Sequence, residues 1–518
     1  MGQLHLLRLM SMQRQRRRRE AQAPGSRDGM FASRTKRKRS PCQQDGDSLA
    51  HEKKMYRGPG LPEDIWHHIH SLLPMRDAAR AASVSRAFLH SWRCHPTLTF
   101  SSESLGLNEN ACGKDGLASV FSSKVGHILA MHSGIGLKTL QIHVPSYFNT
   151  KDYCYLNSWL QTALTPGTEE LTLILHPLKG KYNFPDSLLS NGSGESIRYI
   201  HLVRCSFHSA ATLGCLRSLT RLHLCLVRIT GEELECLLCN SLALERLEVR
   251  YCNRIVCLKV PCRLQQLSYL EVIGGGRLEV IDNEAPNLSS FMFGGDNDVR
   301  LSLSETLQMK RLTIQRSGSV FYARTKLPSM MPNLVALTLR SGREAGTPML
   351  HSKFLHLRHL SISLNGVPFS PGYDYLSLAN FLNAAPSLET FHLDVWQQHM
   401  KHVSIFTDSS DLRQNEEHQH HSLKSVTIKD FCCAKSLVEL TLHVVERTTS
   451  LECMTLEAPQ SILRCSDRDN KSGRCFPMDR DVLMEARRAI LAIRRYIEPK
   501  VPSTVKLQVL EPCSCNDV

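Results

Sequence analysis

Residues 219–249 read LTRLHLCLVRITGEELECLLCNSLALERLEV, and this stretch contains one complete unit of a repeated pattern. It opens with LTRLHL, which has apolar residues at its first, fourth and sixth positions, and the same spacing returns at Leu244 in LERLEV. Between the two segments, Thr230 and Glu233 have the spacing of a helix capping box, and leucines follow on one helical face. The stretch therefore predicts a strand, a return helix and the next strand.

The six-residue segment of this unit returns along most of the chain. Between residues 197 and 357 its copies start 21 to 25 residues apart, which is the period of leucine-rich repeats. One such unit cannot bury its apolar strand face alone, whereas stacked units share a continuous core. The segments begin at residues 137, 197, 219, 244, 267, 288, 309, 334, 357, 388, 423 and 451, and a degenerate copy, EELTLIL, occupies 169–175. We therefore expect an α/β protein whose leucine-rich repeats form a solenoid, or horseshoe.

The excess positive charge lies mainly at the amino end. The chain has a formal net charge of +14, and residues 1–60 hold fifteen Lys or Arg against five Asp or Glu. Like charges this dense prevent compact packing, so we expect a disordered basic tail over residues 1–57. The residues that match a nuclear-import signal are Lys36, Arg37, Lys38 and Arg39. The alternatives are a solvated tail that binds polyanions incidentally, and a stretch upstream of the start codon in use.

The rest of the chain is close to neutral, which argues against a specific nucleic-acid-binding domain. It lacks an apolar run long enough to span a membrane. Many of its nineteen cysteines stand inside leucine-rich strands, where a free thiol behaves as a small apolar residue. Without a secretory signal the oxidising compartment that disulfides need is not implied. We expect a reduced protein of the nucleus and cytoplasm, with no membrane partner and no specific nucleic acid.

Residues 61–77, LPEDIWHHIHSLLPMRD, predict a short helix that begins at one proline and ends at another. Ile65, Ile69, Leu72 and Leu73 fall on one side of it, and two more short helices follow, ending near Trp92. Three helices of this size bury little apolar surface by themselves. We therefore expect this unit to complete its core with a partner.

The stretch LPEDIWHHIHSLLPMRDAARAASVSRAFLHSWR, residues 61–93, resembles an F-box, the module that docks the Skp adaptor of SCF-type ubiquitin ligases. The resemblance implies an apolar adaptor-binding surface made by Leu61, Pro62, Ile65, Ile69, Leu73, Val84 and Trp92. Ala82, Ser83 and Phe88 depart from the residues usual in F-boxes, which implies a weaker contact. The alternative is a three-helix cap on the domain that follows.

The carboxyl end, from RDVLMEARRAI onward, resembles the closing segment of plant F-box proteins with leucine-rich repeats and an FBD-type end. We expect a helix over 481–497 and a strand over 505–510 that seals the last repeat. The expected organisation is a tail (1–57), an F-box (58–98), a helical linker or cap (99–136), the repeats (137–480) and a C-terminal capping helix and strand (481–518).

The variable positions between the strand leucines face one side of the expected sheet, because side chains alternate along a strand. These positions are rich in Arg, His and Tyr, which make good interface anchors. The candidate target-binding residues are Arg221, His223, Arg246, Glu248, Arg250, Tyr269, Arg311 and Arg340. The hypothesis is an acidic or phosphorylated protein target, and the alternative is a merely solvated face.

Catalytic and cofactor motifs are missing from the sequence. GGGR at 274–277 lacks the strand and helix that a dinucleotide-binding loop needs, and no HExxH or nucleophile elbow occurs. Cys236-x-x-Cys239 and Cys513-x-Cys515 lack a second pair at zinc-finger spacing, and EEHQHH at 416–421 is typical of a loop. We therefore expect no catalytic residue, no metal site and no cofactor.

Together these features predict a non-catalytic substrate-recognition subunit of an SCF-type ubiquitin ligase. Its F-box would dock the Skp adaptor, and through it a cullin, while the repeats would bind an unknown protein target. The conjugating enzyme would supply the chemistry, and this chain would supply proximity. One alternative is a nuclear interaction scaffold that assembles no ligase. Another is a receptor with a small-molecule glue under the repeats.

Overall fold

The computed structural model describes residues 62–84, 86–107, 114–148, 150–176, 181–190, 192–208, 216–295, 299–303, 306–344, 346–364, 372–396, 402–407, 411–413, 419–461, 465 and 475–513. The chain divides into two units, Met1–Pro62 and Glu63–Val518. The expected basic tail, its import signal and Leu61 lie outside the described residues.

Three short helices open the second unit, as the sequence predicts. They are α2 (Glu63–Ser71), α3 (Met75–Ala82) and α4 (Arg86–Arg93). Pro74 occupies the N-cap of α3, and acidic residues stand in the first turn of α2, at the positive end of its dipole. The Trp66 and Phe88 rings meet edge to face at 4.9 Å, so α2 packs against α4.

A single sheet of fifteen strands, all parallel, then runs through the unit. Its strands are β1 (Thr97–Phe100), β2 (Thr139–Val144), β3 (Glu170–Leu175), β4 (Tyr199–Val203), β5 (Arg221–Cys225), β6 (Arg246–Arg250), β8 (Tyr269–Ile273), β10 (Ser290–Gly294), β12 (Arg311–Gln315), β13 (Ala336–Ser341), β14 (His359–Leu364), β15 (Thr390–Asp394), β16 (Ser425–Lys429), β17 (Cys453–Glu457) and β18 (Lys506–Leu510). Each predicted repeat segment, including the degenerate copy at 169–175, forms one of these strands. The predicted solenoid is therefore confirmed.

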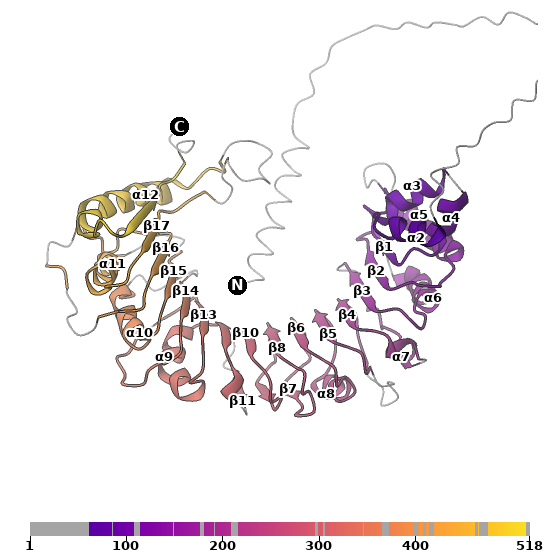
Figure 1. The fold of residues 1–518 in the computed structure, drawn as a ribbon, viewed down its shortest axis with the longest axis horizontal. Helices are drawn as coiled ribbons and strands as arrows, with labels where there is room; N and C mark the ends of the chain where they lie inside the picture. Colours follow the sequence, from indigo (N-terminus) through magenta and orange to yellow (C-terminus); the bar gives the residue numbers. More distant parts are fainter. Residues whose placement is uncertain are drawn as a thin grey trace, which may run out of the picture. The chain divides into compact units, whose positions relative to one another are not determined.

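The strands follow an arc, with the sheet on its inner side and return helices on its outer side (Figure 1). The α-helices after the first three are α5 (Lys114–Met131), α6 (Tyr153–Ala163), α7 (Ser187–Ser190), α8 (Gly231–Cys239), α9 (Ser319–Met330), α10 (Ala379–Asn383), α11 (Lys435–Arg447) and α12 (Arg480–Ala492). The shorter helical turns are η1 (Thr150–Asp152), η2 (Ser193–Glu195), η3 (Thr306–Gln308), η4 (Tyr375–Leu378), η5 (Ile493–Ile497) and η6 (Glu498–Lys500). In the part of the chain that the structure describes, none of the helices combines the length and the apolar character needed to cross a bilayer.

The capping box predicted in front of α8 is present. The Thr230 side chain accepts from the Glu233 backbone N–H at 3.2 Å, and the Glu233 carboxylate accepts from the Thr230 N–H at 2.8 Å. Three return segments form strands instead of helices: β7 (Cys257–Val260), β9 (Val280–Asn283) and β11 (Arg300–Leu303) make a second, three-stranded sheet. They fall where successive repeats start only 21 to 23 residues apart, which leaves too little chain for a helix.

The end of the sheet also follows the prediction. The helix expected over 481–497 is α12 continued by the π-helical turn η5, and the strand expected over 505–510 is β18. β18 pairs with β17 and is the last strand of the sheet. The sheet thus runs from Thr97 to Leu510, across both boundaries expected for the repeats at 137 and 480.

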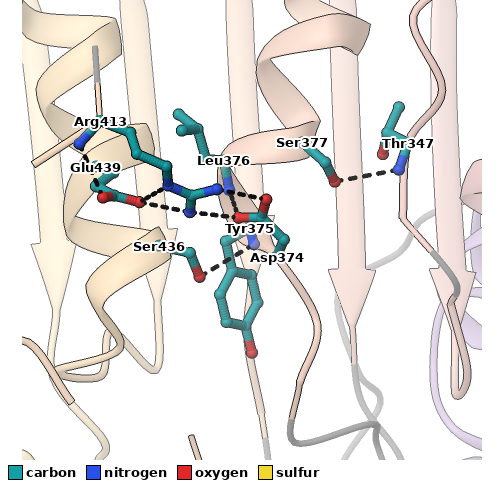
Figure 2. A network of polar contacts seen from close by, with 8 residues as sticks. All are labelled: Thr347, Asp374, Tyr375, Leu376, Ser377, Arg413, Ser436 and Glu439. Carbon is teal, nitrogen blue, oxygen red and sulfur yellow. Dashed lines mark hydrogen bonds and ion pairs between the residues drawn. The ribbon is translucent and has the colours of Figure 1, made fainter. Parts of the chain in front are cut away.

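A polar network joins consecutive repeats on the outer side of the sheet (Figure 2). Arg413 donates two hydrogen bonds to Asp374, both at 2.9 Å, and its Nε and Nη2 donate to Glu439 on α11 at 2.9 and 2.6 Å. Asp374 in turn accepts from the Leu376 N–H at the start of η4. The Glu439 carboxylate is fully buried, so its charge depends on this arginine.

Replacing Arg413 tests that dependence. Arg413→Ala leaves the Glu439 carboxylate buried without its cation, and we expect a loss of about 2 kcal/mol in the free energy of unfolding, measured from the urea midpoint. Arg413→Lys should rescue little, because an ammonium cannot make the bidentate contact. The matched control is Arg358→Ala, which removes an exposed pair with Glu389 and should cost less than about 1 kcal/mol. Equal losses in Arg413→Ala and Arg358→Ala would contradict this account.

Candidate functional site

The first candidate site is the outward side of α2. Ile65 and Ile69 lie one helical turn apart on α2, Leu72 follows directly after its end, and these three residues are 41%, 37% and 72% exposed. An adjacent side of the helix carries Trp66 and His70, which pack on Phe88. His70 is only 2% exposed, and burial lowers its pKa. The helix thus buries a histidine and leaves its aliphatic stripe open, the reverse of what a self-contained domain would do.

The other residues of the expected adaptor surface divide into two groups. Pro62 is exposed, and Val84, in the turn after α3, is 80% exposed. Leu73 and Trp92 are partly buried within this unit: His95 Nε2 lies 3.2 Å from the Leu73 carbonyl oxygen, and Trp92 packs against the core. Leu72 was left out of the expected surface, although the apolar spacing of the helix places it on the same stripe as Ile65 and Ile69.

The second candidate site is the inner face of the sheet between β3 and β8. Arg221, His223, Arg246, Glu248, Arg250 and Tyr269 lie on adjacent strands there. Arg311 and Arg340 lie apart from them, on β12 and β13, where both are exposed and form no ion pair with any described residue. The structure therefore brings most of the expected target-binding residues together and leaves two outside the group.

The charged residues of this group pair with one another. Arg246 Nε lies 2.6 Å from a Glu248 oxygen, and the guanidinium stacks 3.7 Å from the centroid of the Tyr269 ring. Arg250 bridges Glu248 at 3.0 Å and Glu271 at 2.6 Å. Burial works to raise the pKa of Glu248, but the hydrogen bond from Arg246 and the nearby positive charges hold that pKa below its usual value. These two arginines are therefore already paired and are poor partners for an acidic target.

Two stacked histidines lie beside these paired charges on the same face of the sheet. His201 and His223 stack with ring centroids 4.1 Å apart and planes 5° from parallel. Burial, together with His223, lowers the pKa of His201 to about 4, and burial also lowers the pKa of His223. Both rings are therefore neutral near neutral pH, and this part of the face is aromatic and uncharged.

Positive charge that forms no ion pair with a described residue lies instead in a cavity of about 340 Å³ beyond the carboxyl ends of β3 to β6. Among the described residues its lining holds no acidic side chain, and its cationic residues are Lys181, Arg204, Arg228 and Arg254. The Arg228 Nη1 is buried and has no hydrogen-bond partner in the part of the chain that the structure describes. An unsatisfied guanidinium N–H in a basic cavity is suited to a carboxylate or phosphate.

The backbone around this cavity is constrained. Arg204, Leu226 and Tyr251, each just past a strand, have φ of 63°, 56° and 55°, a left-handed conformation that costs non-glycine residues about 1 kcal/mol or more. Each is held there by a backbone hydrogen bond to the following strand, as from the Arg204 N–H to the Cys225 carbonyl at 3.0 Å. These residues lie in loops, where the period of the strand leucines does not extend, so the repeat pattern does not reveal them.

Comparison with known proteins agrees with this architecture. Residues 59–98 match the F-box domain, and residues 128–514 match the family described as At1g61320/AtMIF1, LRR domain. Three Arabidopsis thaliana relatives are F-box/LRR-repeat protein At3g26922, F-box/LRR-repeat protein At5g02910 and F-box/FBD/LRR-repeat protein At2g04230. Their identities to this chain are 22%, 25% and 29%, over 62%, 41% and 37% of this chain. The matches span 94% of the first relative and 42% of each of the other two.

The parallel sheet of repeats and the three amino-terminal helices define a leucine-rich-repeat protein with an amino-terminal F-box. The chain belongs to the plant F-box proteins with leucine-rich repeats, in the At1g61320/AtMIF1 LRR-domain family. In general, this pair of domains is that of substrate-recognition adaptors of SCF-type ubiquitin ligases.

The low pKa of His201 provides a test by pH. The unfolded chain binds a proton at this histidine near pH 6.5, whereas the folded chain binds it only near pH 4. The free energy of unfolding should therefore fall as the pH drops through this window. His201→Gln removes the proton site, so its urea midpoint should fall less than that of the wild type between about pH 7 and about pH 5.

His356→Gln, at an exposed histidine before β14, is the control and should behave as the wild type. An unchanged pH dependence in His201→Gln would show that the stacked pair is not held neutral.

Proposed function

We propose that this chain is a substrate-recognition subunit of an SCF-type ubiquitin ligase. The observation that carries the proposal is the open aliphatic stripe of α2, at Ile65, Ile69 and Leu72. Burying a side chain of this kind contributes about 1.5 to 3 kcal/mol. A Skp-type adaptor that covers the stripe would gain that energy and would bring a cullin with it.

The repeats would then hold the target near the conjugating enzyme. Ubiquitin transfer needs no catalytic group from this chain, because holding two reactants together is itself a large acceleration. The proposed location is the nucleus and cytoplasm, with import through Lys36, Arg37, Lys38 and Arg39, which lie outside the described residues.

We further propose that the target presents an acidic or phosphorylated side chain to the basic cavity. The paired charges of Arg246 and Arg250 favour this cavity over the strand face as the anion-binding region. The neutral stack of His201 and His223 and the ring of Tyr199, with Arg221 4.7 Å from its centroid, would contact apolar or aromatic parts of the same target.

Adaptor binding can be tested with charged substitutions on the stripe. Ile65→Asp combined with Ile69→Asp should weaken capture of a purified plant Skp-type adaptor by about 30-fold or more, since each removes an apolar anchor. Leu242→Asp is the matched control, because that leucine is also about half exposed, at 51%, but lies between α8 and β6. Equal capture by the double variant and the wild type would leave the interaction scaffold as the better interpretation.

Target recognition can be tested by proximity labelling in plant cells with the proteasome inhibited. Arg228→Ala combined with Arg254→Ala should reduce labelling of the target about tenfold or more, because charge-assisted hydrogen bonds in the cavity are lost. The charge-matched control is Arg263→Ala with Arg277→Ala, two exposed arginines outside the cavity lining. Unchanged labelling of every target in the first double variant would remove the cavity from the recognition site.

A further inference from the structure

Three cysteines from two parts of the sequence meet at the carboxyl end of the solenoid. The sulfur atoms of Cys465, Cys475 and Cys513 all lie within 4.8 Å of one another. Cys465 Sγ lies 3.5 Å from Cys513 Sγ, and the Cys465 backbone N–H donates to Cys475 Sγ at 3.3 Å. All three residues are partly buried and none forms a disulfide.

These separations fit a shared metal ion. Bonded disulfide sulfurs lie about 2.05 Å apart. Thiolates that bind one zinc at about 2.3 Å, at the corners of a tetrahedron, lie about 3.8 Å apart. The 3.5 Å pair and the 4.8 Å limit on the cluster correspond to the second arrangement. Thiolate sulfur is also the ligand that favours zinc over magnesium or calcium.

The segments that carry the cysteines are held by hydrogen bonds around the cluster. Gln460 Nε2 donates to the Glu511 carbonyl at 2.9 Å, which ties the chain before Cys465 to the chain before Cys513. The Ser461 hydroxyl donates to the Phe476 carbonyl, next to Cys475. These hydrogen bonds hold the segments that carry the thiols, as hydrogen bonds around metal ligands do.

We propose that Cys465, Cys475 and Cys513 bind a structural Zn²⁺ ion. Water would complete the tetrahedral coordination of the ion as the fourth ligand. The ion would join the chain after β17, the chain before α12 and the chain after β18. Because β18 pairs only with β17 and ends the sheet, this link would fasten the terminal strand that closes the repeats.

Metal content provides the direct test. The full-length chain, purified under reducing conditions without chelator, should contain about one zinc per chain by inductively coupled plasma mass spectrometry. Cys475→Ser and Cys513→Ser should each contain less than about a tenth of that amount. Cys154→Ser and Cys262→Ser are the controls, because both cysteines are exposed and lie far from the cluster in sequence. These controls should retain the metal.

Cobalt binding to the wild type tests the site even where a variant fails to fold. After the zinc has been removed with a chelator, added Co²⁺ should give the sulfur-to-metal absorption and the visible bands of a tetrahedral thiolate site. Added Zn²⁺ should abolish these bands and raise the thermal midpoint of the chain.

Three results would overturn the proposal: a zinc-free wild type that gives no cobalt–thiolate absorption, full zinc retention in both cluster variants, or a Cys465–Cys513 disulfide found by mass spectrometry of the reduced-purified chain. None of these results bears on adaptor capture by α2, so the zinc site and the ligase assignment stand or fall separately.

Discussion

Each repeat of this chain depends on its neighbours, because one short strand cannot cover its own apolar face. The register of the parallel sheet meets this constraint, because it places apolar residues of neighbouring strands side by side. Leu222, Leu247, Leu270 and Phe291 are consecutive partners across β5, β6, β8 and β10, and all four are buried. The capping box of α8 and the network around Arg413 fix the return segments that support this ladder from the outer side.

A stack of this kind has two ends at which a strand lacks a neighbour. At the first end, β1 pairs only with β2, and the F-box helix α3 lies against it through Met75, whose sulfur accepts from the Thr99 N–H at 3.2 Å. At the second end, β18 is followed by the proposed zinc ligand Cys513. The F-box therefore closes the solenoid with α3, while the stripe of α2 stays open. The same three helices can thus both cap the repeats and dock a partner.

Most strands of the sheet could be predicted from the sequence because their segments carry three apolar residues at fixed spacing, as in LTRLHL. β1, Thr97–Phe100, could not, since its segment TLTF has only two apolar residues and lies ahead of the repeats. The F-box helices could be predicted from Pro62, Pro74 and the spacing of Ile65 and Ile69. The second sheet of β7, β9 and β11 could not, since the short return segments have no helical or strand period of their own. The partial burial of Leu73 and Trp92 depends on contacts within the folded unit, such as that of His95 with Leu73, which the motif does not contain.

The functional residues were harder to predict because their partners are distant in sequence. Arg250 can be read as a free cation until the register places Glu271 2.6 Å from it. The cavity around Arg228 is built by loop residues with positive φ, which carry no periodic signal. The sequence shows no ligand partner close to Cys513, because Cys465 lies 48 residues away and meets it only when β17 and β18 pair.

The central claim is that the aliphatic side of α2 is left uncovered for another protein. Hydrogen–deuterium exchange of the full-length chain, with and without a purified Skp-type adaptor, tests this claim most directly. The account predicts slower exchange over residues 63–84 when the adaptor is present, with no change over β4 to β8. Unchanged exchange over residues 63–84, or protection confined to the repeats, would contradict it.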